Sequence, residues 1–206
     1  MARILFPYAR ARLPDFVRTH RDDPAVRDAL DGVRLLAGAP DLDEVGAITT
    51  LLGWIDEDRK ATPLKDLQGL IWQEGYAAGD FRGELYGDVV PALRRWHAAG
   101  RRLYVYSSGS VAAQRLLFGH SDQGDLTPLF SGYFDTRIGA KNETESYRRI
   151  AAEIGEAPGA ILFLSDSERE LDAAAEAGFQ VIRLTRDGAV VSRYRVVESF
   201  AEIFAG

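Results

Sequence analysis

Cysteine is absent from the 206-residue sequence, which excludes disulfide bonds and thiol chemistry. An apolar run near the roughly 20 residues that span a bilayer is also absent, as is a signal-peptide pattern, so we expect a cytoplasmic protein without a membrane partner. Positive charge is not in excess, because the formal net charge is −6. Nucleic-acid phosphates are bound by basic surfaces, so we expect no nucleic-acid partner.

The composition that remains, 46% hydrophobic and 27% charged, is that of a globular protein. In its second half, short β-branched and aromatic runs alternate with helical patterns such as "SVAAQRLLFG" and "ETESYRRIAAEIG". This alternation predicts βαβ units, and therefore an α/β fold with a doubly wound, largely parallel sheet. The expected strands are "RLYVYS" (102–107), "YFDTRIG" (133–139), "AILFLS" (160–165) and "FQVIRLT" (179–185).

The first half has a different pattern, with helix-like segments and no convincing strand between residues 14 and 84. Such a block ahead of an α/β block predicts a helical domain at 14–84, with 1–13 and 85–206 forming the α/β core. We expect residues 88–100 to form a helix that leads into the first strand. The end of the chain, "RDGAVVSRYRVVESFAEIF", predicts a loop and a closing amphipathic helix.

Polar side chains follow the first expected strand, where ligands bind in open α/β sheets. "YVYSSGS" places Ser107 and Ser108 at the strand end, and Gly109 and Ser110 open the next helix. Hydroxyls beside free backbone N–H groups at a helix N-terminus form a cradle for phosphate. A serine that only caps the helix is the alternative interpretation.

The next two strands end near charged side chains. Lys141 follows the second strand, where its ammonium could neutralise a phosphate oxygen, although a lone lysine there is usually solvated. Asp166 ends "ILFLSD" and Glu170 lies four residues further on. Oxygen ligands of this kind suit Mg²⁺, whereas a helix cap is the simpler role for Asp166. Serine, lysine and aspartate at successive strand ends are together much more specific than any one alone.

Several longer segments resemble the enolase-phosphatases (acireductone synthases) of methionine salvage, which belong to the haloacid dehalogenase-like phosphohydrolases. The resemblance runs along nearly the whole chain, and its serine segment is the most distinctive part. The segments that carry it are "LFPYARARLPDFV", "DEDRKATPLKDLQGLIW", "LYVYSSGSVAAQRLLFGHSDQGDL", "GYFDTRIGAK" and "ILFLSDSERELDAAAEAGF".

The resemblance implies an enzyme that enolises and then dephosphorylates 2,3-diketo-5-methylthiopentyl-1-phosphate with the help of Mg²⁺. It implies that Ser107, Ser108 and Lys141 hold the substrate phosphate. It also implies that Asp166 is a metal ligand, which we expect Glu170 to support. The helical block matches the cap that closes over such sites and excludes water. We expect a monomer whose partner is this small phosphorylated diketone.

One part of the family pattern, the D-x-E-G-T-T motif that ends the first core strand and carries the nucleophilic aspartate, does not occur in residues 1–206. "DLDEV" (41–45) fits the wider pattern D-x-D-x-[TV], but no apolar strand precedes it, so Asp41 or Asp43 is better explained as a helix cap. Without that central strand we expect two unpaired strand edges and a hydrophobic gap.

Two explanations of the missing motif remain. We favour a truncated sequence, because everything downstream keeps the enzyme pattern. The alternative is a non-catalytic relative that binds a phosphate ligand without the nucleophile. An unrelated receiver-type or flavin-type domain is disfavoured by the strand-end serines, the lysine and the helical block.

Overall fold

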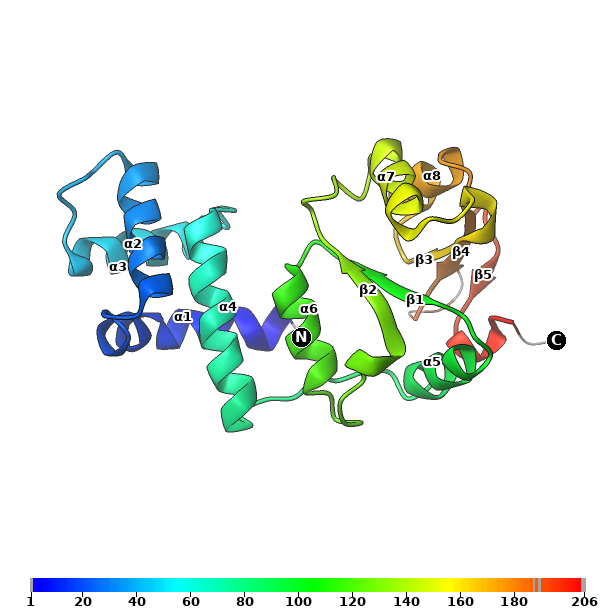
Figure 1. Ribbon diagram of the computed structural model, residues 1–206, viewed down its shortest axis with the longest axis horizontal. Coiled ribbons are helices and arrows are strands. Elements are labelled where there is room, and N and C mark those ends of the chain that lie inside the picture. Colours follow the sequence, from blue (N-terminus) through cyan, green and yellow to red (C-terminus); the bar gives the residue numbers. More distant parts are fainter. Residues whose placement is uncertain (1, 187, 189, 205–206) are drawn as a thin grey trace. The chain divides into compact units, whose positions relative to one another are not determined.

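The computed structural model describes residues 2–186, 188 and 190–204, with side chains from Ile4 onward. The chain forms two compact units, Met1–Gly83 and Glu84–Gly206. Figure 1 shows that the first unit consists of helices and that all strands lie in the second. In the described part of the chain, no helix is both long and apolar enough to cross a membrane.

The helical unit contains the helices expected from the sequence, and their ends follow local capping chemistry. The Asp23 carboxylate accepts a hydrogen bond from the Ala25 N–H at the start of the second helix. Gly38, with a φ of 67°, caps the end of that helix. Asp43 caps the third helix and accepts from the Gly46 N–H at 2.7 Å, which confirms the capping role expected for this acid. The helices are α1 (Ala2–Thr19), α2 (Pro24–Ala37), α3 (Glu44–Asp56) and α4 (Thr62–Ala78).

Residues 1–13 were expected in the α/β core, and for the described residues 2–13 the structure corrects this. They form most of α1, which packs on α3 and α4 within the helical unit. Ala9, Leu13 and Val17 are spaced four residues apart and each is 0% exposed. Their apolar stripe is therefore buried against the other helices, and this burial fixes α1 in the helical unit.

The second unit is built from parallel strands and helices, as the sequence predicts. Every strand pair is parallel, and short 3₁₀ turns (η) connect several elements. The elements are α5 (Val89–Ala98), β1 (Leu103–Tyr106), α6 (Val111–Gly119), η1 (Thr127–Leu129), β2 (Phe130–Phe134), α7 (Thr144–Ile154), η2 (Pro158–Ala160), β3 (Leu162–Ser165), α8 (Glu168–Glu176), β4 (Gln180–Leu184), β5 (Val196–Val197) and η3 (Phe200–Glu202).

The strands form two separate sheets, β1-β2 and β3-β4-β5. Tyr106 is paired with Phe134 across the first sheet, and Leu162 with Gln180 across the second. Among the described residues, β1 and β3 therefore each keep one unpaired edge. This split matches the two open edges expected when a central strand is missing.

The two sheets nevertheless share the same layers. Tyr104 and Tyr106 of β1 and Phe163 of β3 pack against one apolar cluster, which includes residues of α7 and α8. Their sequence neighbours Leu103 and Leu162 pack against a second cluster, which includes α5 residues. Successive strand residues point to opposite faces, so the helices cover both faces of one discontinuous sheet.

The second strand begins and ends earlier than the expected range 133–139. β2 ends at Phe134 because the Asp135 carboxylate turns the chain, accepting hydrogen bonds from the N–H groups of Arg137 at 2.9 Å and Val111 at 3.1 Å. Asp135 is only 7% exposed. The Asp135 side chain, and not a neighbouring strand, is therefore the hydrogen-bond partner of the backbone here, and residues 136–139 lie outside the strand.

The expected closing helix is also corrected. Val196 and Val197 pair with β4 as the strand β5, and only the 3₁₀ turn η3 follows. Two groups in this segment bind Asp88: the Phe200 N–H donates to its carboxylate at 2.7 Å and the Ser199 hydroxyl at 3.0 Å. These bonds anchor the segment to the start of α5 in a conformation that is not an α-helix.

Candidate active site at the carboxyl ends of the strands

The serine segment continues directly from β1. The Ser107 N–H donates to the Phe134 carbonyl at 3.1 Å and so prolongs the β1-β2 ladder, while its hydroxyl oxygen accepts from the Gly109 N–H at 3.2 Å. Ser110, not Ser107 or Ser108, caps α6 by accepting from the Ala113 N–H. Ser107 is half-buried and Ser108 is exposed. Neither of them is needed as the cap of α6.

Lys141 is held in a fixed position beside the end of β1. Its Nζ lies 2.6 Å from Glu170 Oε2 and 5.8 Å from the centre of the Tyr106 ring. Its carbonyl accepts a hydrogen bond from the Tyr147 hydroxyl at 2.6 Å. Its side chain is 23% exposed. Burial raises the pKa of both Tyr106 and Tyr147, which keeps these phenols neutral.

Glu170 lies in the first turn of α8, where it binds two groups. Its Oε2 pairs with Lys141 and accepts a hydrogen bond from the Ser165 hydroxyl at 2.7 Å. Ser165 is the last residue of β3, and its own oxygen accepts from the Ser167 N–H at 3.1 Å. The structure thus uses Glu170 to position the lysine, and its support of a metal stays a prediction.

Asp166 is exposed directly after β3 and lines a cavity together with Lys141 and Ser165. Among the described residues, Asp166 makes no hydrogen bond or ion pair, and no group of three or more His, Asp or Glu side chains is placed to hold a metal. The donor set at this point is therefore one free carboxylate beside a fixed ammonium. This set fits Mg²⁺ only in its usual form, with water and phosphate oxygens supplying most ligands.

Lys141 shows that β1 and β3 end at the same edge. The ring of Tyr106, the last residue of β1, lies beside the ammonium, and Glu170 connects that ammonium to Ser165 at the end of β3. The sequence predicted that Ser107, Ser108 and Lys141 converge at the edge that Asp166 shares. Lys141 and Asp166 line the same cavity, and the convergence of the two serines with them stays a prediction. The sequence did not indicate Tyr106, Tyr147 or Ser165, because aromatic and small residues at these positions are equally typical of a sheet core.

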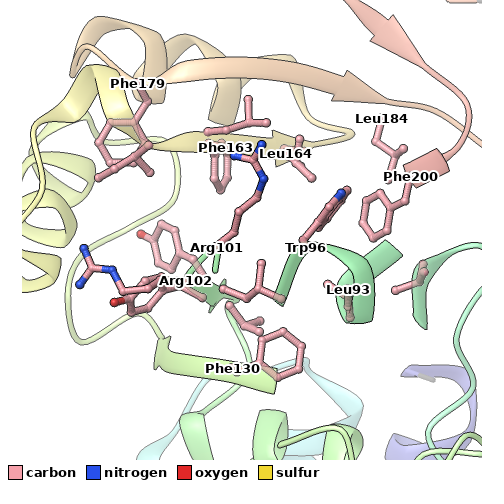
Figure 2. Close-up of a pocket in the computed structure, with 18 of the residues that line it drawn as sticks. Leu93, Trp96, Arg101, Arg102, Phe130, Phe163, Leu164, Phe179, Leu184 and Phe200 are labelled. Carbon is pink, nitrogen blue, oxygen red and sulfur yellow. The ribbon is translucent and has the colours of Figure 1, made fainter. Parts of the chain in front are cut away.

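The cavity that begins at this edge has a volume of about 1240 Å³ and extends between the two sheets. All residues of β1 and β3 line it, as do residues of α5. Figure 2 shows Phe163 and Leu164 of β3 on one side of the cavity and Trp96 of α5 on the other. Its lining is therefore mixed: apolar residues of β1, β3 and α5 alternate with the charged residues Arg101, Arg102, Glu156, Arg183 and Arg186, and Lys141 and Asp166 line it as well.

Comparison with known proteins identifies the family. The model of the haloacid dehalogenase-like hydrolases matches residues 12–178. The chain is 60% identical over 185 residues to the protein named Enolase-phosphatase E1 of Thioalkalivibrio sulfidiphilus, covering 90% of this chain and 82% of that relative. It is 56% identical over 200 residues to Enolase-phosphatase E1 of Pseudomonas syringae pv. syringae, covering 97% of this chain and 88% of the relative.

Solved structures agree with the fold. The UTR4 protein of Saccharomyces cerevisiae superposes with a TM-score of 0.82 at 32% identity, over 97% of this chain and 91% of that one. CbbY of Rhodobacter sphaeroides, in its complex with phosphate, gives a TM-score of 0.56 at 20% identity over 86% of this chain and 88% of that one, which supports the fold alone. The chain belongs to the enolase-phosphatases, within the haloacid dehalogenase-like hydrolases.

Proposed function

We propose that this site binds the phosphate of 2,3-diketo-5-methylthiopentyl-1-phosphate, which the enzyme enolises and dephosphorylates to the acireductone in methionine salvage. The enzyme class follows from the relatives named Enolase-phosphatase E1. The observation that carries the assignment of residues is the position of Lys141 between the ends of β1 and β3. In open α/β sheets, small molecules bind outside the carboxyl ends of the strands. A phosphate at this edge is therefore held by both halves of the sheet.

Lys141 supplies the positive charge in this proposal. Its ammonium is already paired with Glu170 at 2.6 Å, so it does not need to be ordered when substrate binds. Two of its three N–H donors remain for phosphate oxygens. The Ser107 and Ser108 segment lies directly after Tyr106 and adds hydroxyl and backbone donors. A preorganised cation and several neutral donors together match the charge and geometry of a phosphate dianion.

Asp166 is the residue that would hold Mg²⁺. Bound at this carboxylate, a divalent ion would neutralise part of the negative charge of the phosphate. Asp166 is suited to this because it is exposed at the strand end and makes no other bond in the described part of the chain. A monomeric state and the role of the helical unit as a lid stay predictions.

Binding of the diketo phosphate to residues 1–206, measured by calorimetry, tests the assignment of the phosphate site. The substitution Lys141→Met should raise the dissociation constant about 10-fold to 100-fold, since a charge-assisted hydrogen bond contributes about 1.5–3 kcal/mol. Arg148→Met is the matched control, because Arg148 is an exposed cation on α7 with 56% of its side chain accessible. Equal affinities of the two variants would contradict the proposal.

The same titration separates the enzyme from the alternative of a non-catalytic binding protein. Binding to the chain preceded by a nucleophile-bearing strand, accompanied by an absorbance change from the enol product or by release of phosphate, supports the enzyme. Binding that leaves the substrate unchanged, even after a nucleophile-bearing strand is supplied, favours the non-catalytic relative.

A further inference from the structure

The segment that carries Lys141 is held by side-chain hydroxyls. Residues 139–142 lie between β2 and α7 and belong to neither a strand nor a helix, so no ladder fixes their peptide groups. Instead, three consecutive backbone carbonyls each accept a hydrogen bond from a hydroxyl, and we call these three bonds the hydroxyl clamp. The pairs are Gly139 with Tyr106 at 2.9 Å, Ala140 with Ser146 at 2.8 Å and Lys141 with Tyr147 at 2.6 Å.

The three donors of the hydroxyl clamp are themselves fixed by the core. Tyr106 is the last residue of β1, and Ser146 and Tyr147 lie in the first turn of α7, where they are 1% and 0% exposed. The Tyr147 ring contacts the Tyr106 ring at 5.7 Å and the Phe163 ring of β3 at 5.1 Å between ring centres. These donors cannot turn away without disturbing close-packed side chains, so the carbonyls that they bind are fixed as well.

A single bond of this kind would be ordinary, because a buried tyrosine hydroxyl usually finds an acceptor. Two observations set the hydroxyl clamp apart. Its donors come from two elements of the fold and converge on successive peptide groups of one short segment. The hydroxyl of Tyr133 is buried too, yet it has no hydrogen-bond partner among the described residues. The fold therefore does not supply an acceptor for every buried hydroxyl, and it supplies three at Lys141 and the two residues before it.

Lys141 is consequently fixed at both ends of its side chain. At the far end its Nζ lies 2.6 Å from Glu170 Oε2, and at the near end its own carbonyl is bound by Tyr147. Lysine is among the side chains that lose the most rotamer freedom when they are ordered. A lysine that is already ordered in the free protein does not incur this loss when an anion binds. The hydroxyl clamp and Glu170 therefore act on the same ammonium from opposite ends.

We propose that the hydroxyl clamp positions Lys141 for phosphate binding, with Tyr147 as its principal donor. The proposal rests on the proposed function, because it takes Lys141 as a ligand of the phosphate. Tyr147 is the principal donor because its acceptor is the carbonyl of Lys141 itself and its bond is the shortest of the three. The three hydroxyls act through the backbone, which they also prevent from turning its carbonyl oxygens toward the anion. They are positioning groups and do not contact the substrate.

Binding of 2,3-diketo-5-methylthiopentyl-1-phosphate to the 206-residue chain, measured by calorimetry, tests the proposal. Tyr147→Phe removes one hydroxyl and keeps the buried ring. It should raise the dissociation constant about 3-fold to 10-fold, since a less ordered lysine must be fixed on binding. Tyr133→Phe is the matched control, because it removes a hydroxyl that has no partner in the described part of the chain, and its affinity should be unchanged. Equal affinities of the two variants would overturn the proposal.

A double-mutant cycle separates positioning of Lys141 from a general loosening of the site. Tyr147→Phe is combined with Lys141→Met, and the affinity of the double variant is compared with that of Lys141→Met alone. If the hydroxyl acts through the lysine, the two should differ less than about 2-fold. A loss as large as the one in the unmodified background would mean that Tyr147 acts by another route, and the proposal would fail.

The same measurements distinguish this proposal from the assignment of the phosphate site. If Lys141→Met binds as tightly as the unmodified chain, the phosphate assignment is wrong, and the positioning role is lost with it. If Lys141→Met binds weakly while Tyr147→Phe binds as Tyr133→Phe does, the assignment stands and only the positioning role is overturned.

Amide hydrogen exchange gives a readout that needs no ligand. Tyr147→Phe should speed exchange in residues 139–142 at least about 3-fold, whereas exchange in β3 and β4 should change less, because only the segment bound by the hydroxyl is released. Tyr133→Phe should leave both regions unaltered. If Tyr147→Phe does not fold, Tyr106→Phe takes its place in every measurement, since it removes the hydroxyl bound to Gly139. Exchange in 139–142 that matches that of the unmodified chain would overturn the proposal.

Discussion

Lys141 Nζ lies 2.6 Å from Glu170 Oε2, and this ion pair connects two parts of a sheet that share no ladder among the described residues. Glu170 is also bonded to Ser165 at the end of β3, while Lys141 lies beside Tyr106 at the end of β1. The pair therefore has a structural role, because it connects the ends of the two parts of the sheet. It fixes the candidate phosphate-binding ammonium before substrate arrives.

Removing the carboxylate of this pair should destabilise the protein. Glu170→Gln leaves a partly buried ammonium without its counter-charge, and we expect the free energy of unfolding in urea to fall by about 1–3 kcal/mol. Glu145→Gln is the matched control, because its pair with Arg148 is 3.6 Å long and 56% exposed at both side chains. The control should change stability by about 0.5 kcal/mol or less. Similar losses in both variants would show that the pair has no structural role.

Asp166 should determine the response to metal. In a chain preceded by a strand that ends in D-x-E-G-T-T, Asp166→Asn should raise the Mg²⁺ concentration for half-maximal activation at least 10-fold, because one anionic ligand is lost. Glu153→Gln, an exposed change on α7, should leave the titration unaltered. A Mg²⁺ titration that is the same for Asp166→Asn and the unmodified chain would remove Asp166 from the site.

Gly139, two residues before Lys141, has a backbone conformation and surroundings in which any side chain should destabilise the protein. Its φ is 142°, its carbonyl accepts from the Tyr106 hydroxyl at 2.9 Å, and an added Cβ would collide with the Ser146 hydroxyl. We expect Gly139→Ala to lower the free energy of unfolding by about 1–3 kcal/mol. Gly159→Ala, where a Cβ meets nothing, is the control and should have little effect. Urea unfolding that gives equal stabilities would contradict the strain argument.

Ionisation of Asp88 should determine how the free energy of unfolding changes at acidic pH. Burial alone would raise its pKa, but the Phe200 N–H, the Arg186 guanidinium and the Ser199 hydroxyl hold this pKa below its usual value. A lowered folded pKa means that the stabilisation is present above the unfolded value of about 3.9 and is lost as pH falls through the folded value. Near neutral pH, Asp88→Asn should therefore cost about 1–3 kcal/mol.

The difference between the Asp88→Asn variant and the unmodified chain should shrink as the pH falls below about 4, because the unmodified carboxyl is then protonated too. Urea unfolding at several pH values measures this. A difference that stays constant down to the lowest pH at which the chain is folded would assign the effect to packing instead of charge.

The order of strands and helices could be predicted from sequence because parallel strands between helices leave strong patterns. The apolar runs before Ser107 and Asp166 correspond closely to β1 and β3. Asp43 was also recognisable as a cap, since no apolar run precedes it. The strands and the helix cap depend on residues that are neighbours in the sequence, so they can be predicted from it.

The remaining features depend on contacts between distant residues. The predicted end of β2 was wrong because the Asp135 carboxylate accepts a hydrogen bond from the N–H of Val111, the first residue of α6. The prediction of a closing helix was wrong because the segment is held by hydrogen bonds to Asp88, which is more than 100 positions away in the sequence. The Lys141–Glu170 pair was missed for the same reason, although both residues had been selected as candidates.

The most direct test of the central claim compares residues 1–206 with the same chain preceded by a strand ending in D-x-E-G-T-T. Phosphate release from 2,3-diketo-5-methylthiopentyl-1-phosphate is measured for both with Mg²⁺. Loss of a nucleophile typically costs on the order of 10⁴ to 10⁶ in kcat, so we predict measurable turnover only from the extended chain. Absence of turnover from the extended chain, or equal turnover from residues 1–206 alone through an acid such as Asp41 or Asp43, would contradict the account.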